Sequence, residues 1–312
     1  MQAYRDFRQF YNQSIHPELL YLERKRLRLL RLCTVGGVMI LGVVALQIYF
    51  DVFALTLILG LSAGFGAVFL AFRIQTYYTE FKPRIVELIL DYIDNEVNFS
   101  FEGFDPKGGI PAERFLASKI FPTAEIYHAE DLIKGQIRET PIELCELRVR
   151  EISPVRNRLD RVFVGLFLVG DYRRQDMKGA TLALPDSYRK YLSRSERAFH
   201  LMGARRVRNN LLPEFEALFD TYATPDTRIS DVLSTDLQRS ILQFLQRFQA
   251  MNRQKDIYFS IIRDKIYIAL TQDKNLLEPS LLSSNVRYET VLEFYEDLRI
   301  ALDLALEVDA MN

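Results

Sequence analysis

The chain has 312 residues and is close to neutral, with 40 Lys and Arg against 41 Asp and Glu. This balance lacks the basic excess of nucleic-acid-binding proteins, so no nucleic-acid partner is expected. The two cysteines, Cys33 and Cys145, are too few and too far apart in the sequence to indicate a disulfide framework or a zinc cluster.

Residues 1–31 form a basic N-terminal segment, with seven Lys and Arg against three Asp and Glu. Pro17 followed by Glu18 favours the start of a helix. Most of the basic residues lie directly before an apolar tract, where they serve as a topology signal, as contacts with anionic lipid, or as both. The candidate lipid-contact residues are Arg24, Lys25, Arg26, Arg28 and Arg31.

Residues 32–72 form an apolar tract whose only charged residue is Asp51. A single helix over this tract would be about 60 Å long, roughly twice the 30 Å thickness of the hydrocarbon core. Division at Asp51 gives two segments, 32–50 and 53–72, each close to the roughly 20 residues that cross a bilayer. Asp51 in the turn stays hydrated. The sequence therefore predicts a transmembrane helical hairpin and not a cleaved signal peptide, since a second span follows the first at once.

Basic residues flank the tract on both sides, and the turn between the spans has none. The run at 24–31 precedes the first span, and Arg73, Lys82 and Arg84 follow the second. The positive-inside rule then predicts a protein integral to the cytoplasmic (inner) membrane, with two spans and with both termini and the globular part in the cytoplasm.

The second span carries a GxxxG pattern at Gly60 and Gly64. Small residues at this spacing let two helices approach closely. Two uses stay open, which are packing of the second span against the first and packing against another protomer. Neither span contains a charged residue, so this chain alone makes a poor transport path.

Residues 73–100 are predicted to form an amphipathic linker or stalk helix. Their apolar residues recur at spacings of three and four, which is helical, and Pro83 is expected to bend the helix. The helix is either a short coiled-coil stalk or lies on the following domain. The apolar positions are Ile74, Tyr78, Phe81, Ile85, Leu88 and Tyr92.

Residues 101–312 are predicted to form a cytoplasmic domain that mixes helices and strands. The loop 103–111 leads into a short helix that ends before Pro122. Alternating and continuous apolar runs over 140–185 predict an antiparallel meander, with a bulge where the alternation in 142–149 changes phase. The basic stretch 187–208 is interpreted as a solvated connector.

The remainder of the domain mixes helices with one hairpin. A helix begins near Pro213, breaks at Thr224 and resumes after Ser234, the expected N-cap, with apolar positions 233, 237, 241, 244 and 248. Residues 256–270 predict a β-hairpin around Asp264-Lys265, and a long amphipathic helix closes the chain. The predicted fold class is therefore α+β, with an N-terminal transmembrane hairpin, antiparallel strands and a long C-terminal helix.

The sequence predicts no catalytic, metal-binding or cofactor-binding residue and no cofactor. His128 lies among Glu125, Glu130 and Asp131, but the other histidines are remote in the sequence. Cys145 lies in a strand pattern and is interpreted as a buried, inert thiol. Neither a phosphate-binding glycine loop nor a serine nucleophile motif occurs in the sequence.

Four stretches together resemble a bacterial membrane-protein family known as domain of unknown function 3137. Their order and spacing carry the resemblance, which with the apolar tract covers roughly residues 20–310. It implies a bacterial, membrane-anchored protein with a cytoplasmic α+β domain, and it supplies no activity. The stretches are "SKIFPTAEIYHAEDLIKG" (118–135), "FVGLFLVGDYRRQDMKGATLALPDS" (163–187), "LPEFEALFDTYATPDTRISDVLS" (212–234) and "IYFSIIRDKIYIAL" (257–270).

Three functions are compatible with the sequence. The first is a non-catalytic, membrane-anchored interaction or regulatory module that binds a protein partner or itself, since tethering raises the local concentration. The second is a membrane-associated enzyme acting on a lipid or nucleotide-like substrate, and the third is a lipid-sensing domain. A deep pocket with converging acids or histidines would favour the enzyme, and a shallow apolar patch would favour the binding module.

Overall fold

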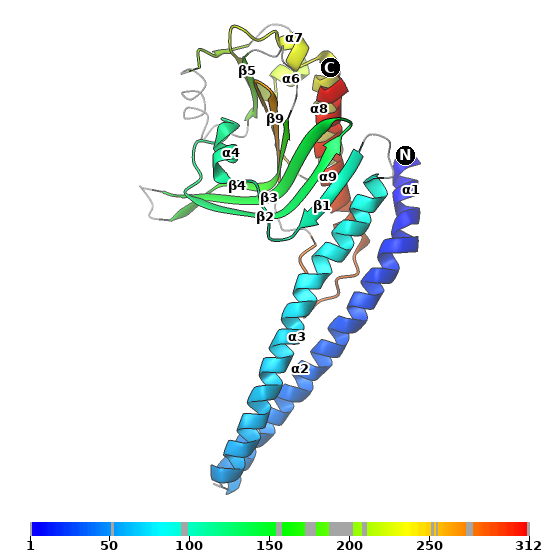
Figure 1. Ribbon diagram of the computed structural model, residues 1–312, viewed down its shortest axis with the longest axis vertical. Coiled ribbons are helices and arrows are strands. Elements are labelled where there is room, and N and C mark those ends of the chain that lie inside the picture. The colour runs from blue at the N-terminus through cyan, green and yellow to red at the C-terminus, as the bar shows by residue number, and fades with distance from the viewer. Residues whose placement is uncertain are drawn as a thin grey trace. The chain divides into compact units, whose positions relative to one another are not determined.

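The structure is a computed structural model that describes residues 2–50, 53–94, 99–153, 158–171, 179–186, 202–207, 211–250, 253, 255–272 and 277–310. The chain divides into two compact units (Figure 1). The first unit comprises Met1–Tyr92 and Leu276–Glu293, and the second comprises Ile93–Asn275 and Phe294–Asn312. Of the predicted features, the turn at Asp51 and most of the basic stretch 187–208 lie outside the described residues.

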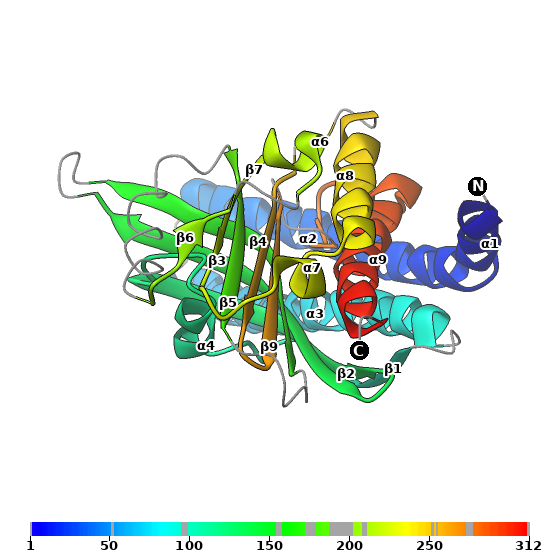
Figure 2. The ribbon, with the colours of Figure 1, turned by 90° about the horizontal axis from the view of Figure 1, so that it is seen from above.

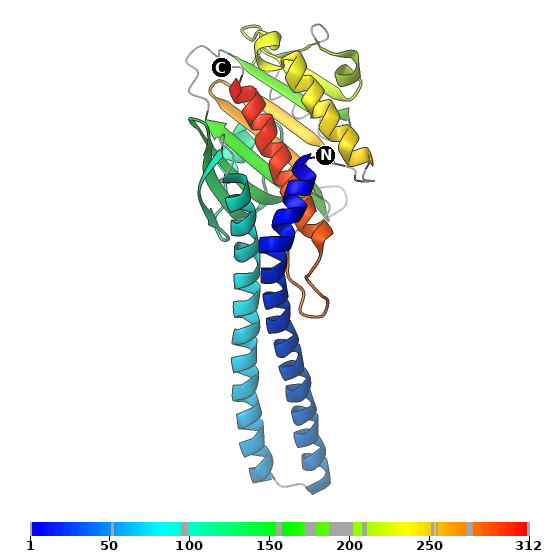
Figure 3. The same cartoon turned by 90° about the vertical axis from the view of Figure 1, so that its right-hand side faces the viewer.

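Two long helices dominate the first unit. Helix α1 (Gln2–Phe10) and a π-helical turn (Tyr11–Ile15) lead into α2 (His16–Phe50), and α3 (Phe53–Asp94) follows. Figure 3 shows α2 and α3 side by side along their length. The predicted spans 32–50 and 53–72 are therefore parts of two longer helices, α2 and α3. Helix α3 continues through Pro83 without a break.

Both helices are long and apolar enough to cross a membrane. The most apolar 18-residue window has a mean hydropathy of 2.2 in the first helix and 2.0 in the second. Only 6% of the first window and 0% of the second are buried. Ile48 and Phe65, for example, are 80% and 77% exposed. A core helix of a soluble domain would bury such side chains, so these helices are candidate membrane spans.

The membrane-distal part of α3 buries a different face from the predicted one. Tyr78 belonged to the predicted stripe and is exposed, whereas Tyr77 is buried. Phe81 and Ile85 are common to both sets. The face is shifted because α3 packs on α2 and also on residues 277–293, which lie about two hundred residues later in the chain. The helix also ends at Asp94, earlier than the predicted residue 100, and residue 99 already begins a strand.

The second unit is built on a nine-stranded antiparallel sheet of order β1-β2-β3-β4-β9-β8-β5-β7-β6, as far as the described residues show. The strands are β1 (Phe99–Asp105), β2 (Ile126–Ile137), β3 (Thr140–Ile152), β4 (Leu159–Asp171), β5 (Ala180–Pro185), β6 (Arg205–Arg206), β7 (Phe219–Ala223), β8 (Ile257–Ile262) and β9 (Lys265–Thr271). The described helices are α4 (Ala112–Ala117), α6 (Pro213–Glu216), α7 (Ile229–Val232), α8 (Thr235–Ala250) and α9 (Tyr288–Ala310), and α9 begins in the first unit.

The predicted meander is confirmed for β3 and β4 and is wrong for β5. Strand β9 pairs with β4 over Gly165–Asp171, so β9 and β8 separate β4 from β5. A Cβ added at Gly165 would lie 2.0 Å from the carbonyl oxygen of Leu270, so only glycine permits this approach. Sequence reasoning could not find this pairing, because β9 lies about a hundred residues beyond β4.

The change of phase in β3 has two structural causes. Residues 144–147 are buried on both faces of the sheet, which hides the alternation. The register is irregular in the neighbouring strand β2, between Glu130 and Ile133, and also between Val149 and Arg150 of β3. The extra residues lie on the partner strands β2 and β4, so the prediction of a bulge in β3 itself is wrong.

Helices cover both faces of the sheet. Phe115 of α4 stacks on Phe121 at 4.7 Å between ring centroids and meets Phe167 of β4 at 5.3 Å. Helices α8 and α9 lie side by side (Figure 2), and the Ser240 hydroxyl of α8 donates a hydrogen bond to Glu307 of α9. These layers confirm the α+β class and the long C-terminal helix.

Candidate functional sites

Polar side chains gather in the first unit just outside the two apolar spans. They come from residues 18–31 of α2, 73–84 of α3 and the segment 277–287, and we call this group the collar. Figure 3 shows the segment next to α2, and a hydrogen bond and an ion pair connect it with α3. The collar is therefore formed by parts of the chain that are far apart in the sequence.

Arg26 lies at the centre of the collar and is buried, at 5% exposure. Its Nη2 and Nε atoms donate to the two carboxylate oxygens of Glu23 at 2.7 and 3.0 Å. Its Nη1 atom donates to the carbonyl oxygen of Leu281 at 2.7 Å. The hydrogen bond from Arg26 is the main reason that the pKa of Glu23 is lowered. One guanidinium thus joins a helix turn to the late segment, using the planar fork that arginine provides.

Asn285 closes the late segment into a loop and connects it with α3. Its side-chain amide donates to the Tyr77 hydroxyl at 2.9 Å and to the Ser280 carbonyl at 2.8 Å. Its side-chain oxygen accepts the Ser280 backbone N–H at 2.8 Å. Tyr77 is buried, and burial is the main cause of its raised pKa. These bonds fix the loop against both helices.

Ion pairs complete the collar. They join Lys25 to Glu80 at 3.0 Å, Arg84 to Glu18 at 2.6 Å and Lys82 to Glu278 at 3.6 Å. Exposed or half-exposed pairs contribute at most about 1 kcal/mol each. Their combined effect is to hold α2, α3 and the loop in one arrangement outside the spans.

The five candidate lipid-contact residues have different environments in the structure. Arg26 is buried, and Lys25 is half-buried in its pair with Glu80. Arg24, Arg28 and Arg31 are exposed. These three follow at spacings of four and three, so they lie on one face of α2. The sequence could not separate the two groups, because the partners of Arg26 and Lys25 come from α3 and from the loop as well as from α2.

Gly60 and Gly64 line an open groove of about 710 Å³ with Gln47, Leu57, Leu61, Phe65 and Val68. Among the described residues, a Cβ added at either glycine would meet no atom within 4 Å. The groove is lined by neither acids nor histidines, and Gln47 contributes its one polar side chain. The glycines are therefore open to a lipid or to another helix.

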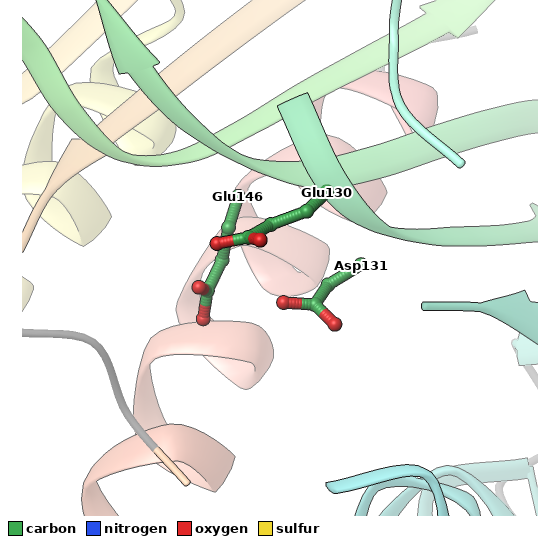
Figure 4. A group of neighbouring side chains, drawn as sticks. All are labelled: Glu130, Asp131 and Glu146. Atoms are coloured by element: carbon green, nitrogen blue, oxygen red, sulfur yellow. The ribbon is translucent and has the colours of Figure 1, made fainter. Parts of the chain in front are cut away.

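Three acidic side chains of the second unit also lie close together. One carboxylate oxygen from each of Glu130, Asp131 and Glu146 lies within 4.8 Å of the other two (Figure 4). Glu130 and Glu146 are cross-strand partners, and Asp131 lies at the irregularity of β2 with a φ of 60°. The sequence pointed to Glu130 and Asp131 but missed Glu146, which only the strand register brings to them.

This acidic cluster is assigned no ligand. Carboxylates at such spacing could bind a hard cation such as Ca²⁺, and such groups also occur without one. Arg148 forms an ion pair with Glu130 and neutralises part of the charge. His128 is exposed and is not part of the cluster. Cys145, next to Glu146 in β3, is fully buried, and burial raises the pKa of its thiol to about 12. That thiol is therefore no nucleophile at neutral pH.

Comparison with known proteins finds a match to a family that has no assigned activity. Residues 161–309 match the family described as "Protein of unknown function (DUF3137)", which confirms the resemblance inferred from the sequence for this part of the chain. No curated protein matches the chain. A solved structure, that of the mycobacterial trehalose monomycolate transport factor A, TtfA, is 12% identical, with 70% of this chain and 94% of that chain covered. Its TM-score is 0.29, too low for any property to be carried over.

Proposed function

We propose that this chain, a member of the DUF3137 family over residues 161–309, is a non-catalytic interaction or regulatory module anchored in the inner membrane of a bacterium. In this proposal α2 and α3 cross the bilayer, and the sheet unit and both termini lie in the cytoplasm. Basic residues on both flanks of the tract support this orientation, because loops rich in Lys and Arg stay on the cytoplasmic side.

The observation that carries the proposal is the exposure of the most apolar part of the chain. The two apolar windows are 6% and 0% buried, although each has a composition typical of a protein core. Burial of apolar surface is worth about 25 cal/mol per Å². A bilayer provides that burial for two antiparallel helices of spanning length.

Arg24, Arg28 and Arg31 are the proposed contacts with anionic lipid. They are exposed on one face of α2 directly before the first span. A basic residue near an anionic surface contributes about 1 kcal/mol, so three give a useful but modest attraction. Arg26 and Lys25 belong instead to the collar, where their charged groups already have carboxylate partners.

The partner is proposed to be another protein or a second copy of this chain. Gly60 and Gly64 leave the surface of α3 open at their positions. A helix from another protomer needs such small residues to pack closely against α3. Two-dimensional confinement raises the concentration of any such partner, so weak contacts become occupied. The groove at these glycines, with its apolar lining, suits a helix better than a polar substrate.

Fractionation of cells that express the untagged full-length chain tests the anchor. We expect the chain in the membrane pellet, resistant to high salt and alkaline carbonate and released by detergent. Recovery in the supernatant of broken cells without detergent would contradict the proposal. Affinity purification from detergent-solubilised native membranes then tests the binding module, and a chain that emerges alone and monomeric after mild washing would contradict it.

A further inference from the structure

The loop of the collar exposes a leucine. Leu282 is 84% exposed, more than any other large apolar side chain among the described residues. Single exposed leucines are common on protein surfaces, so exposure alone carries no meaning. The position of Leu282 and the way the loop is held distinguish it from an ordinary surface leucine.

The backbone on both sides of Leu282 is fixed. The carbonyl of Leu281 accepts the 2.7 Å hydrogen bond from buried Arg26. The N–H of Ser283 donates to the Ser280 hydroxyl at 3.2 Å, and Asn285 closes the same turn through Ser280. A loop held in this way has already lost its conformational entropy, so a contact made by Leu282 needs little further ordering.

The loop lies near the level of the membrane surface. Arg26 precedes Leu32, the first residue of the first span, by six residues, which is about 9 Å along a helix. A bilayer of roughly 40–45 Å with a 30 Å hydrocarbon core has headgroup layers of about 5–8 Å on each side. A residue beside the Leu281 carbonyl is therefore held at the outer margin of the headgroup layer.

The chemistry of the loop also suits this layer. Residues 280–285 carry no charged side chain, and Glu278 is paired with Lys82 at 3.6 Å. Exposed Arg28 and Arg31 lie between the level of the loop and the span. An apolar side chain among serines, held near the level of exposed arginines of α2, is suited to an interfacial membrane contact.

We infer that Leu282 enters the headgroup layer of the bilayer that anchors α2 and α3, so that the loop 280–285 is a third membrane contact of the chain. This inference rests on the proposed anchoring. It gives the collar a role, because Arg26 and Asn285 set the depth and direction of the loop relative to the spans. The first unit is thereby held at a defined level on the membrane.

Tryptophan fluorescence can test the contact, because the chain contains no tryptophan. Three single-substitution variants of the full-length chain are compared, Leu282→Trp, Val35→Trp within the first span and Leu20→Trp twelve residues before it. Val35 and Leu20 are also exposed, at 57% and 42%, so each variant should fold. The chains are reconstituted in phosphatidylcholine vesicles with about one quarter of anionic phosphatidylglycerol, with or without bromine on the acyl chains.

We expect bromine to remove about half of the emission of Leu282→Trp, more than for Leu20→Trp and less than for Val35→Trp, as an interfacial depth requires. Equal quenching of Leu282→Trp and Leu20→Trp, with strong quenching of Val35→Trp, would overturn this inference and leave the anchor intact. A blue-shifted Leu282→Trp emission without bromine quenching would also overturn it, since protein and not lipid would cover the loop. Unquenched Val35→Trp would overturn both proposals.

Discussion

Two arginines two positions apart in the sequence have opposite surroundings. Arg26 is 5% exposed and is bound to a carboxylate and to a carbonyl of a distant loop, whereas Arg24 is exposed and donates to the Leu20 carbonyl of its own helix, at 3.3 Å. Successive positions on a helix point in different directions, so one basic run holds both buried and exposed arginines. The sequence predicted the run, and only the fold assigns a role to each residue in it.

Arg26→Ala should lower the free energy of unfolding by about 3 kcal/mol, because it leaves the partly buried Glu23 carboxylate without its arginine and the Leu281 carbonyl without its donor. Arg24→Ala is the matched control and should change stability by less than about 0.5 kcal/mol. Urea unfolding of the full-length chain in detergent, followed by circular dichroism, measures both. Equal effects of the two substitutions would show that the collar contributes nothing to stability.

Glu23 should make stability depend on pH. The hydrogen bond from Arg26 lowers its pKa below the ordinary value of 4.5. The folded chain therefore holds this proton less tightly than the unfolded chain, and the stabilisation is complete above pH 4.5 and is lost as the pH falls through the lowered pKa.

Comparison of the wild type with Glu23→Gln isolates this group from the other acids. At neutral pH the variant should be less stable by about 2 kcal/mol, since a charged hydrogen bond is lost. The difference should shrink as the pH is lowered below 4.5, where Glu23 becomes neutral in the wild type as well. A difference that stays constant over this range, measured by urea unfolding, would contradict the assigned ion pair.

At the scale of elements, local sequence signals predicted a helix and its cap correctly, whereas the pairing of strands that are distant in the sequence was not predicted. Helix α8 shows the first case, since its four predicted apolar positions and Leu233 just before it are buried, and Ser234 caps it. Strand β7 shows the second, since residues 219–223 were predicted to continue a helix but pair with β5. A five-residue stretch has no decisive propensity of its own, so its partner strand determines its conformation.

Ser234→Ala should destabilise the second unit by about 1 kcal/mol, the usual effect of losing an N-cap. Its hydroxyl accepts the N–H of Leu237 at 3.2 Å at the start of α8. Ser230→Ala is the control, because that exposed hydroxyl donates to the carboxylate of neighbouring Asp231 at 3.0 Å and caps no helix N–H among the described residues. Thermal unfolding of the full-length variants in detergent distinguishes them. Indistinguishable melting temperatures would mean that the cap does not contribute.

At the scale of the whole molecule, the sequence predicted the two apolar helices and the α+β class but not the collar or the acidic cluster. Apolar tracts are visible without any knowledge of the fold, because length and composition define them. The collar needs the loop 277–287 to meet helices that are about two hundred residues earlier. The acidic cluster needs the register that places Glu146 opposite Glu130. Both depend on contacts that a single sequence does not contain.

A cysteine at position 51, which lies outside the described residues, tests on which side of the membrane the turn and the rest of the chain lie. In a Cys33→Ser background, the thiol of Asp51→Cys should react with a membrane-impermeant maleimide in intact spheroplasts, since the turn is predicted to face outward. Cys145 will not interfere, because it is fully buried. Arg239→Cys, on the exposed surface of α8, should react only after the spheroplasts are broken. Protection of the first thiol or early labelling of the second would reverse the orientation, and with it the assignment of Arg24, Arg28 and Arg31 to the cytoplasmic leaflet.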